Sequence, residues 1–456
     1  MTVADENAQA PSEATSRRDT LRLPRPAPGA TPGPVNMVAL RAVPGQPGYQ
    51  PLDVVPQGKL AVPEGLEGEA EVCLGRADTS GALVVADKLG FKPGPSAGTL
   101  TDEQALARTI AVRANLMEGR RQAAVEAMNG HRDDPRMALA DAGVALAQGD
   151  LARADARVKA ALQRRPEGVA EHYTLALVHA ARGNLHDALE ELVEVSRSAP
   201  LHAVARYQLS QVLVAMGDPA RGGTLLEMAM VLAPAFVAPF VTLAELMFRS
   251  RQYRESLGIL EDLFENVPGA LNARLLQLRI FLEVGEKRGA LALASALRES
   301  VPDHPEVRVL WAEALVGAGE TDKAREALKS WVDDPGVDRV RVRRLLAKVE
   351  TQTQHAAEAL DHLKAAYALE RGMGETLLDL VKLAVQQGRH DDARQALESL
   401  PTNPEIDVDD LVSAAMLARS CGLMDTARSL ADSARKLVAG SPAEAQLDAF
   451  ASSLKV

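Results

Sequence analysis

Cysteine and aromatic residues are scarce in this sequence. The 456 residues include only two cysteines, Cys73 and Cys421, which are far apart and belong to no CxxC pair. A disulfide framework or a zinc site needs several cysteines at close spacing, so the sequence favours neither and indicates a reducing compartment. Aromatic residues make up 3% of the chain. We therefore expect a core of many small aliphatic contacts rather than one large aromatic-rich core.

Positive charge and long apolar runs are also lacking. Lys and Arg number 51 against 62 Asp and Glu, which gives a net charge of -11 and argues against nucleic-acid phosphates as the main partner. No stretch approaches the roughly 18 apolar residues of a membrane span. The N-terminus carries Asp5 and Glu6 and leads into no apolar run, unlike a secretory signal. We expect a cytoplasmic protein.

The chain changes character near residue 100. Residues 1–100 hold 13 of the 26 prolines and 12 of the 33 glycines. This density breaks helices and leaves little apolar surface to bury, so we predict a mostly disordered arm over 1–100. Two islands, 35–40 and 69–91, are richer in apolar residues. They are interpreted either as residual apolar content of a linker or as a short hairpin or docking motif that pairs with the folded part or a partner.

From residue 101 onward, proline and glycine recur at a fixed step of 34 residues. Arg251 takes one glycine slot, and the series resumes at Gln354 after a one-residue insertion. Chance accounts poorly for such a series, and a period of this length is typical of a repeat architecture. The prolines are Pro166, Pro200, Pro234, Pro268 and Pro302, and the glycines are Gly149, Gly183, Gly217, Gly285, Gly319, Gly388 and Gly422.

Each unit is predicted to contain two short helices. Five and twelve residues after the slot, most units carry small or apolar residues, such as Ala188 and Val195. These positions share one helix face and let another helix approach closely. Glycine tolerates the left-handed conformation that ends the first helix, and the proline stops the second. One such hairpin cannot bury its apolar stripe alone, so consecutive hairpins must stack.

The period and the slots resemble the tetratricopeptide repeat family. Residues that carry the resemblance include Leu175, Ala176, Gly183, Ala188 and Pro200 in one unit. The family builds right-handed superhelices, so the resemblance implies an all-α solenoid of about ten hairpins over 101–440. At the end, a capping-box pattern that starts at Ser441 predicts a capping helix over 441–456.

No catalytic, metal or cofactor motif stands out. His172, His179 and His186 recur every seven residues, but no HExxH, paired cysteine or phosphate loop after a strand accompanies them. Two of them, His172 and His179, occupy slots that the family fills with large packing residues, so we interpret them as core. We interpret His355 and His362 as exposed helix surface. Because there is also no kinase-like set of motifs, we expect neither catalysis nor a cofactor.

The remaining candidate site is the inner face, which tetratricopeptide proteins typically line with the first helix of each hairpin. Polar residues recur six residues before the slot, and two tyrosines and an arginine lie ten residues before it. The two offsets are one turn apart and share a face, as expected of a groove that reads an extended peptide. A charge ladder between stacked neighbours, worth about 0–1 kcal/mol per exposed pair, is an equally open interpretation. The rows contain Tyr173, Tyr207, Gln211, Glu245, Arg279, Glu313, Arg344, Lys348 and Lys382.

One helix of this face is rich in arginine. Arg341, Arg344 and Lys348 fall on one side of it, and no acid lies between 339 and 349. A cationic patch in an acidic protein favours an acidic segment or a C-terminal carboxylate as the ligand. The other interpretation is a solvated face, because the Asn partners of the carboxylate-binding tetratricopeptide type are missing.

We therefore predict a non-catalytic scaffold or adaptor that binds partner proteins or peptides along the concave face. One alternative is a nucleic-acid or transcription-associated helical-repeat protein that uses the arginine-rich helix, for which binding would fall steeply with salt. Another is a regulatory subunit whose N-terminal arm occupies its own groove. Deletion of 1–100 would then tighten partner binding.

Overall fold

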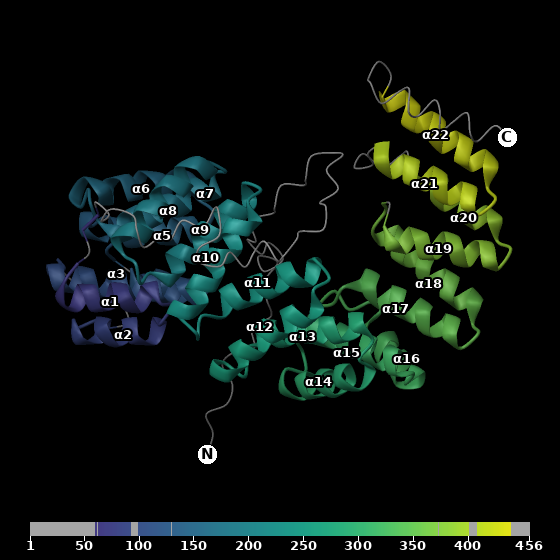
Figure 1. Ribbon diagram of the computed structural model, residues 1–456, viewed down its shortest axis with the longest axis horizontal. Helices are drawn as coiled ribbons and strands as arrows, with labels where there is room; N and C mark the ends of the chain where they lie inside the picture. Colours follow the sequence, from purple (N-terminus) through teal and green to yellow (C-terminus); the bar gives the residue numbers. More distant parts are fainter. Residues whose placement is uncertain are drawn as a thin grey trace, which may run out of the picture. The chain divides into compact units, whose positions relative to one another are not determined.

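The protein is all-helical over the described residues of the computed structural model, which are 60–61, 63–92, 99–128, 130–372, 374–400 and 408–438. They form 22 α-helices and one 3-10 turn, Pro135–Met137, with no strand beyond an isolated parallel bridge between Ala61 and Gly168 (Figure 1). The chain divides into two compact units, Met1–Ala273 and Arg274–Val456. The predicted all-α fold is confirmed for this part of the chain.

The first unit is a stack of helices in which chain neighbours pack together. Contacts are most extensive within the pairs α9–α10, α5–α6 and α7–α8. Its helices are α1 (Gly65–Gly75), α2 (Thr79–Lys88), α3 (Asp102–Met117), α4 (Arg121–Ala127), α5 (Ala138–Ala147), α6 (Leu151–Arg164), α7 (Val169–Ala181), α8 (Leu185–Ser198), α9 (Ala203–Ala215), α10 (Pro219–Leu232), α11 (Val237–Arg249) and α12 (Tyr253–Asn266).

The second unit continues the same pattern, and its hairpins follow one another from green to yellow in Figure 1. The boundary between the units falls within α13 (Leu271–Val284). The other helices are α14 (Lys287–Ser300), α15 (Pro305–Ala318), α16 (Thr321–Trp331), α17 (Arg339–Gln352), α18 (Ala356–Leu369), α19 (Glu375–Gln386), α20 (His390–Glu398), α21 (Val408–Ser420) and α22 (Met424–Val438).

The predicted slots end the first helix of each pair. Gly217 has a φ of 87°, and the two slots without glycine behave alike, since Arg251 has a φ of 58° and Gln354 a φ of 65°. All three are in the left-handed region that terminates helices. The repeating prolines follow the second helix: Pro166 lies two residues after the end of α6, and Pro200 two residues after the end of α8. The period and the hairpin boundaries are confirmed.

The small residues after each slot form the packing face. They are buried throughout, and one hairpin substitutes Ser256, whose hydroxyl donates a hydrogen bond of 2.7 Å to the carbonyl of Ala244. Because alanine leaves little side chain between helices, the backbones can approach closely. Six alanines that lie five residues after the slot have no exposed surface: Ala154, Ala188, Ala324, Ala359, Ala393 and Ala427.

The predicted boundary at residue 100 is wrong. Helices α1 and α2 lie inside the segment predicted as a disordered arm and pack together, and α2 packs on α3. The reason is local: no proline lies between Pro63 and Pro93, so glycine alone did not break these helices. Island 69–91 therefore lies in two packed helices, and its role as a docking motif stays a prediction. Island 35–40, the rest of the arm before residue 60, and the capping helix over 441–456 lie outside the described residues.

Candidate functional site

In the first unit, the predicted inner-face residues contribute both surface and packing. The Tyr173 ring, on α7, lies 5.2 Å from the His202 ring, and burial raises the pKa of its hydroxyl well above the ordinary value. Tyr207, on α9, meets Phe236 edge-on at 5.4 Å. Both tyrosines are half-buried, so they hold helices together as well as facing outward.

The polar members of this row lie on the first helices of successive hairpins. Gln211, on α9, is half-buried. Glu245, on α11, accepts a hydrogen bond of 2.9 Å from Arg249 of its own helix. Arg279, on α13, is exposed. The assignment of these three residues to a peptide-binding groove stays a prediction.

In the second unit, Arg341 joins two neighbouring hairpins. Its guanidinium on α17 lies 2.6 Å from the Glu313 carboxylate and 3.1 Å from that of Glu306, both on α15. Burial alone would lower the pKa of Arg341, but the two carboxylates raise it overall. Arg341 is therefore a fixed cation whose charge is already matched.

Arg344 makes the corresponding connection toward the next hairpin. It lies 2.8 Å from Glu375 and 2.9 Å from Asp379, both on α19. Adjacent hairpins thus supply four carboxylates to Arg341 and Arg344, so the charge of this part of the arginine-rich helix is balanced within the protein. The assignment of Arg341 and Arg344 to a peptide groove stays a prediction.

Lys348 and Lys382 differ from these arginines. They occupy the same slot in consecutive hairpins, on α17 and α19, and both are exposed. Neither ammonium group has an ion-pair partner within the part of the chain that the structure describes. They are the cations of the predicted row that a carboxylate ligand could reach without displacing an internal partner.

A second site, which the sequence did not predict, lies where α1 and the residues before it, from Leu60 on, meet α3, α7 and α9. The Leu60 N–H donates to Ser198 Oγ at 3.0 Å, and the Ala61 N–H donates to the Glu167 carbonyl at 2.6 Å. These bonds hold the segment that leads into α1 against the end of α8 and the turn between α6 and α7. No motif could have revealed them, because both donors are backbone N–H groups.

Two carboxylates of α1 then reach arginines of the repeats. Glu71 forms a two-pronged ion pair with Arg113 of α3, with one contact of 3.1 Å, and both side chains are nearly buried. Burial alone would raise the pKa of Glu71, but Arg113 holds it below the usual range. Glu67 pairs in the same way with Arg165, with one contact of 3.2 Å.

These charges border a cavity of about 260 Å³ in the first unit. Its wall includes Glu71, Arg113 and Arg165, together with Glu171, whose pKa is raised by burial. Nearby, His202 begins α9 by accepting a hydrogen bond of 3.0 Å from the Ala205 N–H on Nδ1. Burial lowers the pKa of His202 to about 4, so the ring is neutral at pH 7.

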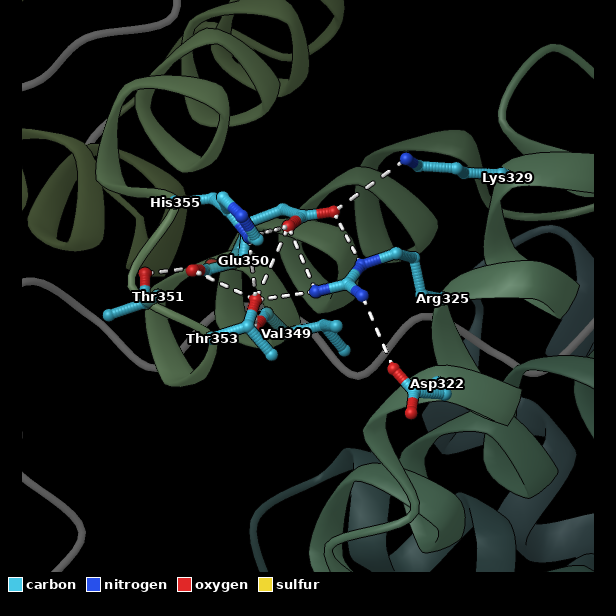
Figure 2. Close-up of polar contacts among 9 residues, drawn as sticks. Asp322, Arg325, Lys329, Val349, Glu350, Thr351, Thr353 and His355 are labelled. Atoms are coloured by element: carbon cyan, nitrogen blue, oxygen red, sulfur yellow. Dashed lines mark hydrogen bonds and ion pairs between the residues drawn. The ribbon is translucent and has the colours of Figure 1, made fainter.

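A buried carboxylate organises the second unit at α16 and α17. Glu350 is 1% exposed, and Arg325 approaches both of its oxygens, at 3.0 and 3.2 Å. Figure 2 shows Lys329 and His355 converging on the same carboxylate, at 4.0 and 3.2 Å. Burial alone would raise the pKa of Glu350, but Arg325 lowers it overall. Because the carboxylate is surrounded by protein donors, we interpret this cluster as structural.

The histidines are only partly the core residues that the sequence predicted. His172 is half-buried, with Nδ1 at 2.5 Å from Glu191 and Nε2 at 2.8 Å from the carbonyl of Pro166. Burial alone would lower the pKa of His172, but these partners raise it. His179 lies 3.7 Å from Asp187. Each histidine therefore combines packing with a carboxylate contact.

The other two histidines, His355 and His362, were predicted to be exposed, and the structure agrees for only one of them. His355 is exposed, as predicted, but His362 is half-buried and burial lowers its pKa.

The described residues include no group of three or more side chains placed to hold a metal ion. Over the same residues, no helix is both long and apolar enough to cross a membrane. A GxSxG pattern does occur at 94–98, outside the described part of the chain. The described elements on either side are helices α2 and α3, whereas a nucleophile elbow joins a strand to a helix.

Comparison with protein families identifies the repeats directly. Tetratricopeptide repeat models match residues 139–200, 281–349 and 351–414. The first match covers α5 to α8, and the others run from the end of α13 into α21. The chain is a member of the tetratricopeptide repeat family.

Solved structures of this architecture show low sequence identity to the chain. A tetratricopeptide repeat protein from Parabacteroides merdae is 14% identical over 55% of this chain and 98% of its own, with a TM-score of 0.42. Yeast Tom70 is 14% identical over 82% and 84%, with a TM-score of 0.44. Human IFIT1, solved as a dimer with PPP-AAAA, is 15% identical over 83% and 96%, with a TM-score of 0.43. No curated protein matches the chain.

Proposed function

We propose that the protein is a non-catalytic scaffold that binds a carboxylate-bearing segment of a partner protein along α15, α17 and α19. Tetratricopeptide repeats generally serve as protein-interaction scaffolds, which supports the class. The observation that carries the proposal is the pair Lys348 and Lys382, exposed in equivalent slots and without internal ion-pair partners.

The paired arginines and the exposed lysines have different tasks in this proposal. Arg341 ties α17 to α15, and Arg344 ties it to α19, so the helices that carry the lysines are held in register. Packed helices lie about 8–10 Å apart, and an extended peptide advances about 3.3 Å per residue. Carboxylates about three residues apart, or one of them at a C-terminus, would span the two ammonium groups.

The nucleic-acid alternative loses its main support. It depended on the arginine-rich helix, but Arg341 and Arg344 are each paired with two carboxylates. A phosphate backbone would have to displace these acids in an already acidic protein. A reducing compartment such as the cytoplasm suits the free cysteines Cys73 and Cys421.

The test is charge reversal in the full chain. Lys348→Glu combined with Lys382→Glu is expected to weaken one acidic partner at least tenfold, a difference of about 1.4 kcal/mol, because both ligand contacts become repulsive. Affinity purification with quantitative mass spectrometry, followed by titration of the recovered partner, measures the loss. Lys287→Glu, on an exposed position of α14, is the matched control. Equal recovery by the two variants would remove these lysines from the site.

A further inference from the structure

Helix α1 has little stability of its own. It spans only 11 residues and includes Gly65, Gly68 and Gly75, and its N-cap residue, Glu64, makes no side-chain capping bond. Isolated helices of this length are marginal in water, and an interior glycine costs about 1 kcal/mol relative to alanine. The conformation of α1 therefore depends on the surface that it covers.

That surface binds α1 through charge on one side and apolar contact on the other. Glu67 and Glu71 are four residues apart, so they share a helix face and reach Arg165 and Arg113. Leu74 is buried in a cluster with α2 and α3. The surface thus selects a helix with two carboxylates at i and i+4 and an apolar flank.

The covered surface includes part of the predicted peptide-reading row. Tyr173, the first residue of that row, stacks beside His202, and a Cβ added at Gly75 of α1 would lie 3.0 Å from the His202 ring. Helix α1 also contacts α9 directly. Within the first unit, α1 therefore occupies the start of the face that we predicted for a ligand.

The fit of α1 on this surface is incomplete. An apolar cavity of about 140 Å³ remains beside it, with Val72 and Leu201 in its wall and 43% and 49% exposed, respectively. His202 lines the same cavity, and its buried Nε2 has no hydrogen-bond partner among the described residues. A larger apolar side chain with a nearby acceptor would fill this cavity and satisfy the imidazole N–H, both of which are favourable.

We propose that α1 is a built-in occupant of this surface, and that an acidic amphipathic helix of a partner protein binds there in its place. Such a helix presents carboxylates at i and i+4 to Arg165 and Arg113 and a bulky apolar side chain to the cavity next to His202. This site lies in the first unit and uses none of the lysines of α17 and α19, so either proposal can fail without the other.

The first experiment compares two full-length variants with the same chemical change on α1. The probe is a fluorescein-labelled peptide of residues 60–76 with Cys73 replaced by Ser. Glu71→Gln loosens the resident helix, so the peptide should bind this variant at least tenfold more tightly than it binds wild type, as measured by anisotropy. Glu69→Gln is the matched control, because Glu69 pairs with Lys88 at a half-exposed position, and it should bind like wild type.

Two results of this experiment would overturn the proposal. One is peptide binding by Glu71→Gln that is no tighter than binding by wild type, with helix content confirmed by circular dichroism. The other is dimerisation of Glu71→Gln in light scattering, since it would assign the surface to α1 of a second copy rather than to a partner helix.

A disulfide variant supplies a second measurement within one protein. A Cβ at position 75 would lie 3.3 Å from the His202 Cα, close enough for Gly75→Cys and His202→Cys to form a disulfide. With Cys73 and Cys421 replaced by Ser, the oxidised protein should not bind the peptide, and reduction should restore binding. Equal binding before and after reduction would contradict displacement of α1.

Discussion

At the residue scale, Glu350 shows how one buried charge holds two helices of the second unit. It is 1% exposed and paired with Arg325. Glu350→Gln removes the charge and should lower the free energy of unfolding of this unit by about 3 kcal/mol, since it breaks an ion pair whose carboxylate is buried. Both tryptophans, Trp311 and Trp331, lie in this unit, 6.3 Å apart, so urea unfolding monitored by tryptophan fluorescence measures the change.

The control for this prediction is Glu358→Gln on α18, where the side chain is exposed and the change should stay within about 0.5 kcal/mol. The pKa of Glu350 lies below the usual glutamate value of 4.5, because Arg325 stabilises the carboxylate despite its burial. Its stabilising contribution is therefore fully present above pH 4.5 and is lost as the pH falls through the folded-state pKa. An unchanged gap between wild type and Glu350→Gln at low pH would contradict the charge assignment.

His202 also predicts a loss of stability at low pH, but here the buried group is a neutral imidazole rather than a charged carboxylate. The groups that act on its ring are Glu71 of α1, Arg113 of α3 and Arg206 of α9, with Tyr173 of α7 beside it. Because burial lowers its pKa from 6.5 to about 4, the unfolded chain binds a proton more readily. The His202 contribution is therefore intact above pH 6.5 and falls by about 3 kcal/mol as the pH approaches 4.

His202→Asn isolates this effect, because asparagine can still cap α9 but does not titrate. The difference in urea-unfolding free energy between wild type and His202→Asn, followed by circular dichroism, should decline between pH 6.5 and 4. This comparison also cancels the contribution of Glu171, whose raised pKa acts in the other direction. A difference that is constant over this range would show that His202 is not buried as the structure has it.

At the element scale, the left-handed residue that ends the first helix of each hairpin leads to a pair of opposite stability predictions. Gln354 is exposed with a φ of 65°, whereas Gly319 has a φ of 86° and open space where a Cβ would lie. A side chain in this conformation costs about 1 kcal/mol. Gln354→Gly should therefore stabilise the second unit and Gly319→Ala should destabilise it, each by about that amount in urea unfolding. Changes of the same sign would contradict the account of the slots.

The helix pairs could be predicted because their signals are local. Glycine and proline act on the backbone at their own positions, so the 34-residue step marked the helix ends directly. Helices α1 and α2 were missed because the proline count was taken over the whole of 1–100, while the stretch between Pro63 and Pro93 has none. A shorter window would have found them.

The ion pairs of the candidate site could not be read from neighbouring residues. Arg341 pairs with Glu306 and Glu313, which are 35 and 28 residues away, and Arg344 pairs with Asp379, which is 35 residues away. Stacking brings residues about one repeat apart into contact, so a search for opposite charges at that separation would have found them. The pair of Glu71 and Arg113 follows no repeat step, because it joins α1 to α3.

At the scale of the whole molecule, each unit offers a different charge arrangement for a ligand. In the second unit the exposed lysines of α17 and α19 are open, and in the first unit the arginines are occupied by α1. A scaffold of stacked hairpins gains affinity by adding separate weak contacts along its length. The two surfaces would let one partner bind directly and require another to displace α1.

The most direct test of the scaffold account is site-specific photo-crosslinking in cells. A photoreactive amino acid replaces Lys348 on the inner row in one full-length protein, and Lys287 on α14 in another. The account predicts a defined crosslinked partner from position 348 and none of that partner from position 287. A partner captured equally from both positions, or none from position 348, would contradict binding along the inner row.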